Sequence, residues 1–284
     1  MIGRIIKVIS NDYTVLVDDK KYICKPRGVF RNQNITPLAG DIVEIDENNI
    51  ITKIFDRKNK LDRPPVSNID MAIIVMSTTK PDFSNILLDK MLTIIEYNNI
   101  KPVICISKSD LLIDDKINES IAYYRKIGYK VLFNTEIDEL KEIIKDKFVI
   151  LTGQTGSGKS SLLNKLDLNL NLKTDEISLA LGRGKHTTRA IEFYQIDNSF
   201  VADTPGFSSL TFNNMTKEDI KNNFIEFRKY NCKYSDCMHI KEDECALKED
   251  LNNNLILKDR YDDYVSFIKE KENENISFNT KKNR

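Results

Sequence analysis

A short glycine-rich segment offers the clearest chemistry in this 284-residue chain. GQTGSGKS, residues 153–160, lies between an apolar run, FVILT, and a helix-like run, KSSLLNKL. Its glycines allow a tight turn whose backbone N–H groups can point at phosphate oxygens. Lys159 would reach the β- and γ-phosphates, and the Ser160 hydroxyl would bind Mg²⁺. We therefore predict a phosphate-binding loop made of Gly153, Gln154, Thr155, Gly156, Ser157, Gly158, Lys159, Ser160 and Ser161.

A second motif, DTPG at 203–206, follows the phosphate loop along the chain. Asp203 ends the apolar run SFVAD, a position from which its carboxylate can hold Mg²⁺ through water. The N–H group of Gly206 can meet the γ-phosphate. A Pro-Gly turn after a strand is common by itself, but after a phosphate loop it predicts a nucleotide hydrolase of the switch type.

The segment GRGKHTTR, residues 182–189, separates these two motifs. Its glycines and polar side chains are typical of a switch loop, in which Thr187 or Thr188 can bind Mg²⁺ beside the γ-phosphate. Many such hydrolases place a water-orienting glutamine directly after DTPG, whereas this chain has Phe207. His186 is the nearest group able to orient water, so we predict that it is catalytic.

The string SKSD at 107–110 resembles the guanine-reading NKxD tetrapeptide. A carboxylate at the fourth position accepts two hydrogen bonds from guanine that adenine cannot supply, and the lysine stem lies across the base. Serine replaces the usual asparagine at the first position, and this shorter side chain predicts lost contacts with the base and the phosphate loop. The expected base-binding residues are Ser107, Lys108, Ser109 and Asp110.

The order of these motifs is itself informative. In ordinary Ras-like GTPases the base-reading string follows the other two motifs, but here it precedes them. This order predicts a circularly permuted GTPase. NTE at 134–136 is a weak match for the second base-contacting string of such enzymes, SAK.

Three of the five cysteines gather with a histidine in the pattern CxxxxCxHxxxxxC. Three thiolates and one imidazole predict a closed tetrahedral site for one structural zinc ion, with no position open for a substrate. Free buried cysteines are a weaker interpretation, because the segment is too polar to bury them. The predicted ligands are Cys232, Cys237, His239 and Cys245.

Composition adds limits on partners and location. Lys and Arg number 43 and Asp and Glu number 43, so any contact with RNA must come from local patches rather than from net charge. The N-terminus has no long apolar run, and no run of 18 apolar residues occurs. We therefore expect a cytoplasmic protein that does not bind a membrane.

Hydrophobic patterning predicts three regions. Short alternating stretches at 41–45 and 50–54 suggest a small N-terminal β-barrel, and the two prolines in DRPPVSNID, residues 62–70, suggest a linker without regular structure. From about residue 213 the chain becomes helical, starting with a capping box in TKED at 216–219. Between them, continuous apolar runs alternate with helix-like stretches, which predicts a parallel sheet covered on both faces. These runs are MAIIVMS at 71–77, PVICIS at 102–107, KVLFN at 130–134 and FVILTG at 148–153.

Taken together, SKSD, GQTGSGKSS, GRGKHTTR, DTPGF and the cysteine pattern, in this order, closely resemble the bacterial RsgA family, also called YjeQ or YloQ. The resemblance covers essentially the whole chain. It implies an α/β multidomain protein with an OB-fold β-barrel that binds RNA (1–65), a circularly permuted P-loop GTPase domain (66–212) and a helical zinc-binding domain (213–284). The family's proposed catalytic histidine corresponds to His186, and its zinc ligands correspond to the four residues of the cysteine pattern.

The same resemblance implies a function. The protein would hydrolyse GTP to GDP and phosphate, with Mg²⁺, during late maturation of the small (30S) ribosomal subunit. Its partners would be GTP, GDP and the small subunit with its rRNA, and it would be a monomer.

Two other classes stay open from the sequence. A P-loop ATPase or kinase would share the phosphate loop but would need no guanine reader. A zinc-containing RNA-binding module could use its nucleotide site mainly for regulation. Comparing GTP with ATP binding separates the first class, and hydrolysis with and without small ribosomal subunits separates the second.

Overall fold

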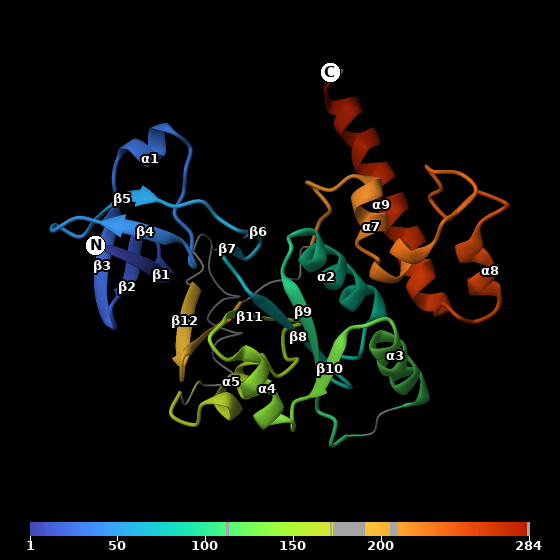
Figure 1. The fold of residues 1–284 in the computed structure, drawn as a ribbon, viewed down its shortest axis with the longest axis horizontal. Helices are drawn as coiled ribbons and strands as arrows, with labels where there is room; N and C mark the ends of the chain where they lie inside the picture. Colours follow the sequence, from blue (N-terminus) through green and yellow to red (C-terminus); the bar gives the residue numbers. More distant parts are fainter. Residues whose placement is uncertain (112–113, 171, 173–190, 205–209, 283–284) are drawn as a thin grey trace.

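The computed structural model describes residues 1–111, 114–170, 172, 191–204 and 210–282. A barrel, a helix-covered sheet and a C-terminal helical region follow one another across the molecule (Figure 1). The predicted order of barrel, α/β region and helical region is thus confirmed.

The N-terminal region is a closed five-stranded barrel, as its alternating pattern predicts. Strand β1 pairs with both β2 and β4, so the order β1-β2-β3-β5-β4 returns to its start. Inward residues such as Ile5, Val15, Val43 and Ile51 fill the interior. Its elements are β1 (Ile2–Ile9), β2 (Asp12–Val17), β3 (Lys20–Pro26), the short helix α1 (Val29–Asn32), β4 (Ile42–Ile45) and β5 (Ile50–Ile54).

The segment expected to be an irregular linker contains a hairpin, which corrects the sequence interpretation. β6 (Lys60–Asp62) and β7 (Pro65–Ser67) pair antiparallel, with Asp62 opposite Pro65 at the turn. A proline at the first position of a strand leaves the rest of the ladder intact. The buried carboxylate of Asp41 accepts a hydrogen bond from Ser67 Oγ at 2.5 Å and so attaches the hairpin to the barrel.

The central sheet has the order β10-β9-β8-β11-β13-β12, and all its pairs are parallel except β12 with β13. Strand β12 also pairs antiparallel with β1, so the described strands of barrel and sheet form one continuous sheet of 11 strands. The four predicted runs are all strands. The elements are β8 (Met71–Ser77), β9 (Lys101–Ser107), β10 (Lys130–Phe133), β11 (Phe148–Thr152), β12 (Ile191–Ile196) and β13 (Ser199–Asp203).

Among the helices that the structure describes, two cover each face of this sheet. Along β8, Ala72, Ile74 and Met76 belong to the core beneath α2 and α3, whereas Ile73 and Val75 belong to the core beneath α4 and α5. Burial on both faces explains why these strands are continuously apolar. The helices are α2 (Asn85–Tyr97), α3 (Asp115–Lys126), α4 (Ile137–Ile144) and α5 (Lys159–Leu166).

The C-terminal region packs through the long helix α9 against α2 (Figure 1). The predicted capping box at its start is confirmed, since Thr216 Oγ1 accepts from Asp219 N at 3.0 Å and Thr216 N donates to Asp219 Oδ2 at 2.8 Å. The described elements are α7 (Lys217–Asn222), the 3₁₀ helix η2 (Ile225–Lys229), α8 (Ala246–Asn252) and α9 (Lys258–Lys282).

A buried ionic network fastens this region to the sheet's helices. Arg260 of α9 is fully buried and bonds to Glu226 in η2 and to Asp89 in α2. The Tyr124 hydroxyl in α3 donates to Asp89 at 2.5 Å. A buried charge keeps its place only when it is paired and hydrogen-bonded, so the network fixes how α9 lies on α2.

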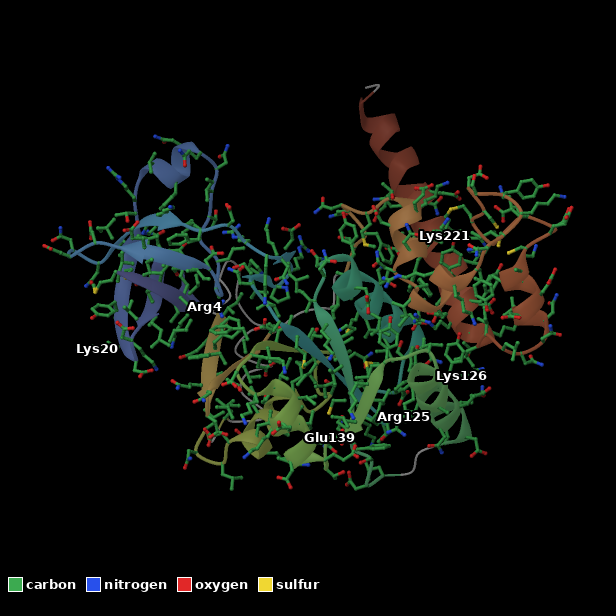
Figure 2. The ribbon with its side chains drawn as sticks, in the orientation of Figure 1. Arg4, Lys20, Arg125, Lys126, Glu139 and Lys221 are labelled. Atoms are coloured by element: carbon green, nitrogen blue, oxygen red, sulfur yellow. The ribbon has the colours of Figure 1, made fainter. Side chains whose placement is uncertain are left out.

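The barrel also contacts the sheet through a side chain. Figure 2 shows Arg4 at the boundary between barrel and sheet, and its guanidinium carbon lies 3.9 Å from the centre of the Phe148 ring. Among the helices that the structure describes, none combines the length and apolar character needed to span a membrane.

Candidate nucleotide site and metal centre

Three predicted motifs meet at one edge of the sheet. The base-reading string and the phosphate loop lie at the carboxyl ends of β9 and β11, and the described part of DTPG, Asp203 and Thr204, lies at the carboxyl end of β13. Because these strands are parallel and closely spaced in the order β9-β8-β11-β13, their ends lie at the same edge. The permuted order of the motifs along the chain therefore leaves them together in space.

The phosphate loop has the backbone that its glycines predict. Gly153, Gly156 and Gly158 have φ of 140°, 79° and 94°, in the region that side chains disfavour. A Cβ on Gly153 would lie 2.2 Å from the carbonyl oxygen of Val75, so the loop approaches β8 too closely for any other residue. Gly158 caps α5, whose N-terminus points its free N–H groups into the loop.

Lys159, the first residue of α5, folds back over the loop. Its Nζ donates to the carbonyl oxygens of Gly153 at 3.0 Å and Gln154 at 2.8 Å. Burial lowers the pKa of this ammonium, and the nearby carboxylate of Asp203 opposes that effect. The positive charge is therefore held at the centre of the loop, where phosphate oxygens would enter.

Ser160 and Asp203 form the pair expected beside a nucleotide-bound Mg²⁺. Ser160 Oγ donates to Asp203 Oδ2 at 2.8 Å. Burial raises the pKa of Asp203, while Lys159 and the Ser160 hydroxyl lower it. A hydroxyl and a carboxylate are hard oxygen donors of the kind that Mg²⁺ prefers, so these residues fit the ion.

Ser157 adds an unsatisfied polar group to the loop. It is fully buried, and within the described residues its hydroxyl has no hydrogen-bond partner. Buried hydroxyls are normally bonded, so this one points to a ligand oxygen as its missing partner.

The serine at the start of the base-reading string does contact the phosphate loop. Ser107 Oγ donates to the carbonyl oxygen of Ser157 at 2.5 Å, so the expected loss of this contact is wrong. The two loops lie close enough for a short side chain to join them, since a Cβ on Gly158 would lie 3.6 Å from the Ser107 side chain.

The rest of the string forms a turn at the sheet edge. Leu111 N donates to the Lys108 carbonyl at 3.0 Å, which places Ser109 and Asp110 at the centre of the turn. Asp110 is exposed, and among the described residues its carboxylate has no partner. Asn134 N donates to Ile106 O at 2.8 Å, so the weakly matching string at 134–136 begins beside the end of β9.

Five residues with predicted roles lie outside the described residues. They are His186, Thr187, Thr188, Gly206 and Phe207. The roles of the first four stay predictions from sequence.

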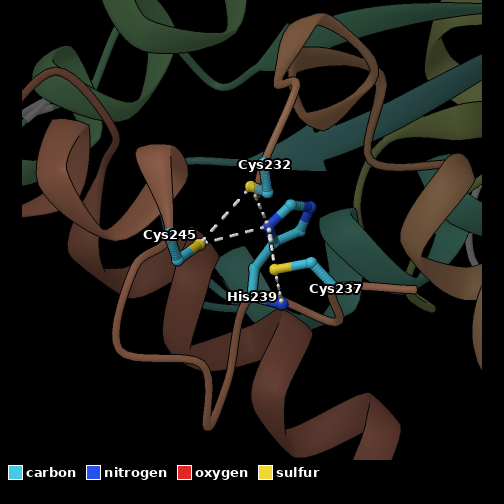
Figure 3. A group of neighbouring side chains, drawn as sticks. All are labelled: Cys232, Cys237, His239 and Cys245. Atoms are coloured by element: carbon cyan, nitrogen blue, oxygen red, sulfur yellow. Dashed lines mark hydrogen bonds between the residues drawn. The ribbon is translucent and has the colours of Figure 1, made fainter. Parts of the chain in front are cut away.

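The four predicted metal ligands converge in the C-terminal region (Figure 3). Cys232 Sγ and Cys245 Sγ lie 3.8 Å apart, and His239 Nδ1 lies 3.5, 3.4 and 3.3 Å from the sulfurs of Cys232, Cys237 and Cys245. Tetrahedral zinc, with bonds of ~2.3 Å to sulfur and ~2.1 Å to nitrogen, requires separations of ~3.8 Å and ~3.6 Å. The group could therefore hold one zinc ion, with His239 binding through Nδ1.

Neighbouring groups hold the ligand loop in place. Tyr261 and Tyr264 of α9 donate to the carbonyl oxygens of His239 and Met238, each at 2.7 Å. Figure 2 shows Lys221 beside this loop, where it donates to Cys237 O at 3.1 Å. Burial raises the pKa of the Cys237 thiol to about 12, so without metal this sulfur would stay protonated.

Some supporting residues escape sequence reasoning. Thr78 follows β8 and bonds to the base-reading loop, and only its place at the end of an apolar strand hints at a role. Arg260 gives a clearer signal. It lies on the same stripe of α9 as Tyr264 and Phe267, where a charged residue predicts a buried partner.

Comparison with known proteins identifies the family to which the chain is similar. The model of the RsgA GTPase family matches residues 54–213, and that of the RsgA N-terminal domain matches residues 2–50. A protein of Oceanobacillus iheyensis named small ribosomal subunit biogenesis GTPase RsgA 2 is 47% identical over 282 residues, covering 94% of this chain and 96% of its own. A Bacillus anthracis protein named small ribosomal subunit biogenesis GTPase RsgA is 45% identical over 283 residues, with the same coverage.

Solved structures agree in fold. YjeQ from Thermotoga maritima superposes with a TM-score of 0.81 at 35% identity, over 95% of this chain and 98% of its own. YloQ, described as a circularly permuted GTPase, superposes with a TM-score of 0.76 at 38% identity, over 96% and 95% of the two chains.

Proposed function

This chain belongs to the RsgA family of GTPases, and from that membership we propose that it hydrolyses GTP to GDP and phosphate on the small ribosomal subunit, late in that subunit's maturation. The observation that carries the proposal is the meeting of three elements at one sheet edge. They are the phosphate loop with Lys159 at its centre, the Ser160–Asp203 pair and the turn that presents Asp110.

The residues divide the work of binding. Backbone N–H groups of the loop and Lys159 bind the β- and γ-phosphates, and the carboxylate of Asp110 accepts from the guanine edge. Ser160 would hold Mg²⁺ directly and Asp203 through water, and Thr187 or Thr188 would be a further ligand. When bound, the ion supplies positive charge that offsets the charge of the phosphates.

We assign the orientation of the attacking water to His186. Phe207 cannot accept or donate a hydrogen bond, so the position that carries glutamine in many GTPases is chemically inert here. His186 has the ring nitrogens for that task.

The zinc ligands have a structural role in this proposal. Cys232, Cys237, His239 and Cys245 would hold one zinc ion with all four of its positions filled, which leaves none for chemistry. The ion would stabilise a loop that carries little regular structure of its own between η2 and α8.

Contact with rRNA would come from the barrel and the zinc-bearing region. The net charge is zero, but β3 and the residue after it carry four exposed cations, Lys20, Lys21, Lys25 and Arg27. Lys25 is partly neutralised by Asp12 at 2.6 Å, which leaves three as candidates for phosphate. We expect the protein to be cytoplasmic and monomeric, because the proposal requires no macromolecular partner other than the small ribosomal subunit.

The direct test is hydrolysis of GTP and of ATP by the full chain, with and without purified small subunits. We expect GTP to be preferred, stimulation by small subunits, and tighter subunit binding with a non-hydrolysable GTP analogue than with GDP, because coupling between two binding sites is reciprocal. If subunits neither accelerate hydrolysis nor distinguish the two nucleotide states, the ribosomal part of the proposal fails while the GTPase part stands.

A further inference from the structure

The segment that follows β8 contacts the base-reading loop at several points. Thr78 N donates to Ser107 O at 3.2 Å, and Thr78 Oγ1 donates to Lys108 O at 2.8 Å. In the other direction, Lys108 Nζ donates to the carbonyl oxygens of Thr79, at 3.2 Å, and Lys80. The main chain and the side-chain end of Lys108 are therefore both attached to residues 78–80.

The carbonyl group that Thr78 binds also closes the turn carrying Asp110. Lys108 O accepts from Leu111 N at 3.0 Å, so one oxygen receives the turn's own hydrogen bond and the Thr78 hydroxyl together. Lys108 itself has φ of 55°, a left-handed conformation that residues with a Cβ rarely adopt. Contacts from outside the turn must hold such a conformation, and the Thr78 hydroxyl is one of them.

Burial makes this contact effective. Thr78 is only 6% exposed, so water competes poorly for its hydroxyl. Just before it, Ser77 pairs in register with Ser107 at the end of the β8–β9 ladder. The Thr78 hydroxyl therefore adds one hydrogen bond beyond the last pair of the β8–β9 ladder. This bond reaches the loop that carries Asp110, the residue that would read guanine.

We propose that Thr78 is a positioning residue for guanine recognition: its hydroxyl fixes the Lys108 carbonyl and thereby the turn that aims Asp110 at the base. The inference rests on the proposed role of Asp110 as guanine reader. Thr78 does not touch the nucleotide in this proposal, and its effect passes through the turn.

The test compares Thr78→Val, which removes the hydroxyl at nearly constant shape, with Thr78→Ser, which keeps it. Affinities for GDP and for inosine diphosphate are measured by displacement of a fluorescent GDP analogue. Inosine lacks the 2-amino group, so a correctly aimed Asp110 should prefer GDP by ~10-fold or more. We expect Thr78→Val to reduce this preference by ~5-fold and Thr78→Ser to preserve it.

Thr79→Val is the matched control, because Lys108 Nζ donates to the backbone oxygen of that residue, which the substitution keeps. Its GDP preference should equal that of the unchanged protein. If Thr78→Val folds poorly, Thr78→Ala compared with Thr78→Ser asks the same question at smaller volume. An unchanged GDP preference in a folded variant without the hydroxyl would overturn the proposal.

Repeating the comparison in the Asp110→Ala variant tests the positioning role of Thr78 separately from the role of Asp110 as guanine reader. In Asp110→Ala the preference for GDP should be lost, and Thr78→Val should then add nothing, because both changes act on one contact. A preference that survives Asp110→Ala refutes the guanine reader itself. A preference that depends on Asp110 but not on Thr78 refutes only the positioning role.

Discussion

At the scale of single residues, the nucleotide site depends on short side chains that span small gaps. Ser107 lacks the reach of asparagine, yet it bonds to the phosphate loop because the loops after β9 and β11 lie close together. From the residue type alone, serine in place of asparagine predicts weaker contacts with the base and with the phosphate loop. The distance that restores the contact is set by how the two strand ends pack across β8, which no local pattern encodes.

The specificity of Asp110 can be reversed. In Asp110→Asn the side chain offers a donor where guanine also offers donors, so GTP affinity should fall by ~10-fold or more. Xanthosine triphosphate presents a carbonyl instead of the 2-amino group and should bind better to the variant than to the unchanged protein. Titration with both nucleotides measures the exchange, and an unaltered GTP affinity would remove Asp110 from the site.

The role of His186 can be separated from binding. His186→Ala should lower the rate of GTP hydrolysis by ~10²-fold with little change in GTP affinity, as expected of a group that acts in the transition state. Single-turnover hydrolysis and equilibrium binding report the two quantities. Phe207→Gln is the companion change, and it should return part of the rate if water orientation is what the histidine supplies. An equal loss of rate and affinity would make His186 a structural residue.

At the scale of elements, continuous apolar runs and caps are the features that sequence predicts best. The run at 71–77 is a strand over its whole length because both of its faces are buried, and the capping box at 216–219 is purely local. The sequence does not predict the hairpin at 60–67, because the hairpin is anchored by the contact of Ser67 with the buried Asp41 beside the barrel. Two prolines lower the local strand propensity of this segment, and local propensity contains no information about a contact with Asp41, which is distant in sequence.

The zinc loop is an element whose folding should depend on its metal. Cys237→Ser removes one buried ligand, so zinc content should fall and the residues around 230–250 should lose protection from hydrogen exchange. Elemental analysis and exchange measurements follow the two effects. Lys233→Ala is a suitable control, because its side chain is exposed and pairs with Glu244 rather than with a ligand. Full zinc occupancy in Cys237→Ser would contradict the ligand set.

At the scale of the whole molecule, the C-terminal region is fixed to the sheet's helices. Asp89 of α2 accepts hydrogen bonds from Arg260 of α9 and from the buried Tyr124, and its charge also acts on Asp263 of α9. Lys90 adds a second link from α2 to α9 through Glu270 at 2.7 Å. Any movement driven by nucleotide must carry α2 and the zinc-bearing region together, because separating them would leave these charges unpaired.

This junction predicts a dependence on pH. Burial, followed by the nearby charge of Asp89, raises the pKa of Asp263 to about 8. The folded protein therefore holds a proton that the unfolded chain releases near pH ~4. The unfolding free energy should fall as pH rises through this window. In Asp263→Asn this side chain no longer titrates, so the unfolding free energy of the variant should fall less over the same pH range than that of the unchanged protein.

The pH dependence of Asp263→Asn and of the unchanged protein can be compared by urea unfolding at pH 5 and pH 8.5. Zinc is kept at ~10-fold excess over protein, so that loss of the metal does not change stability between the two pH values. Comparing the two proteins at each pH cancels the titration of groups that they share. Asp262→Asn supplies the matched control on α9, since its exposed carboxylate pairs with Lys258 rather than with the buried network. Identical pH profiles for Asp263→Asn and the unchanged protein would show that Asp263 holds no extra proton in the folded protein.

The pairing of β12 with β1 has a consequence for how this chain stays in solution. Without the barrel, β12 would be a bare edge of the central sheet, and unpaired edges invite other chains to add strands. Lys7 and Val8 cover its first residues, and Lys7 pairs with Glu192 at 2.7 Å. Because the N-terminal barrel is synthesised first, β1 is available to pair with β12 when β12 leaves the ribosome. A chain shortened to begin after the barrel should therefore aggregate, whatever its affinity for nucleotide.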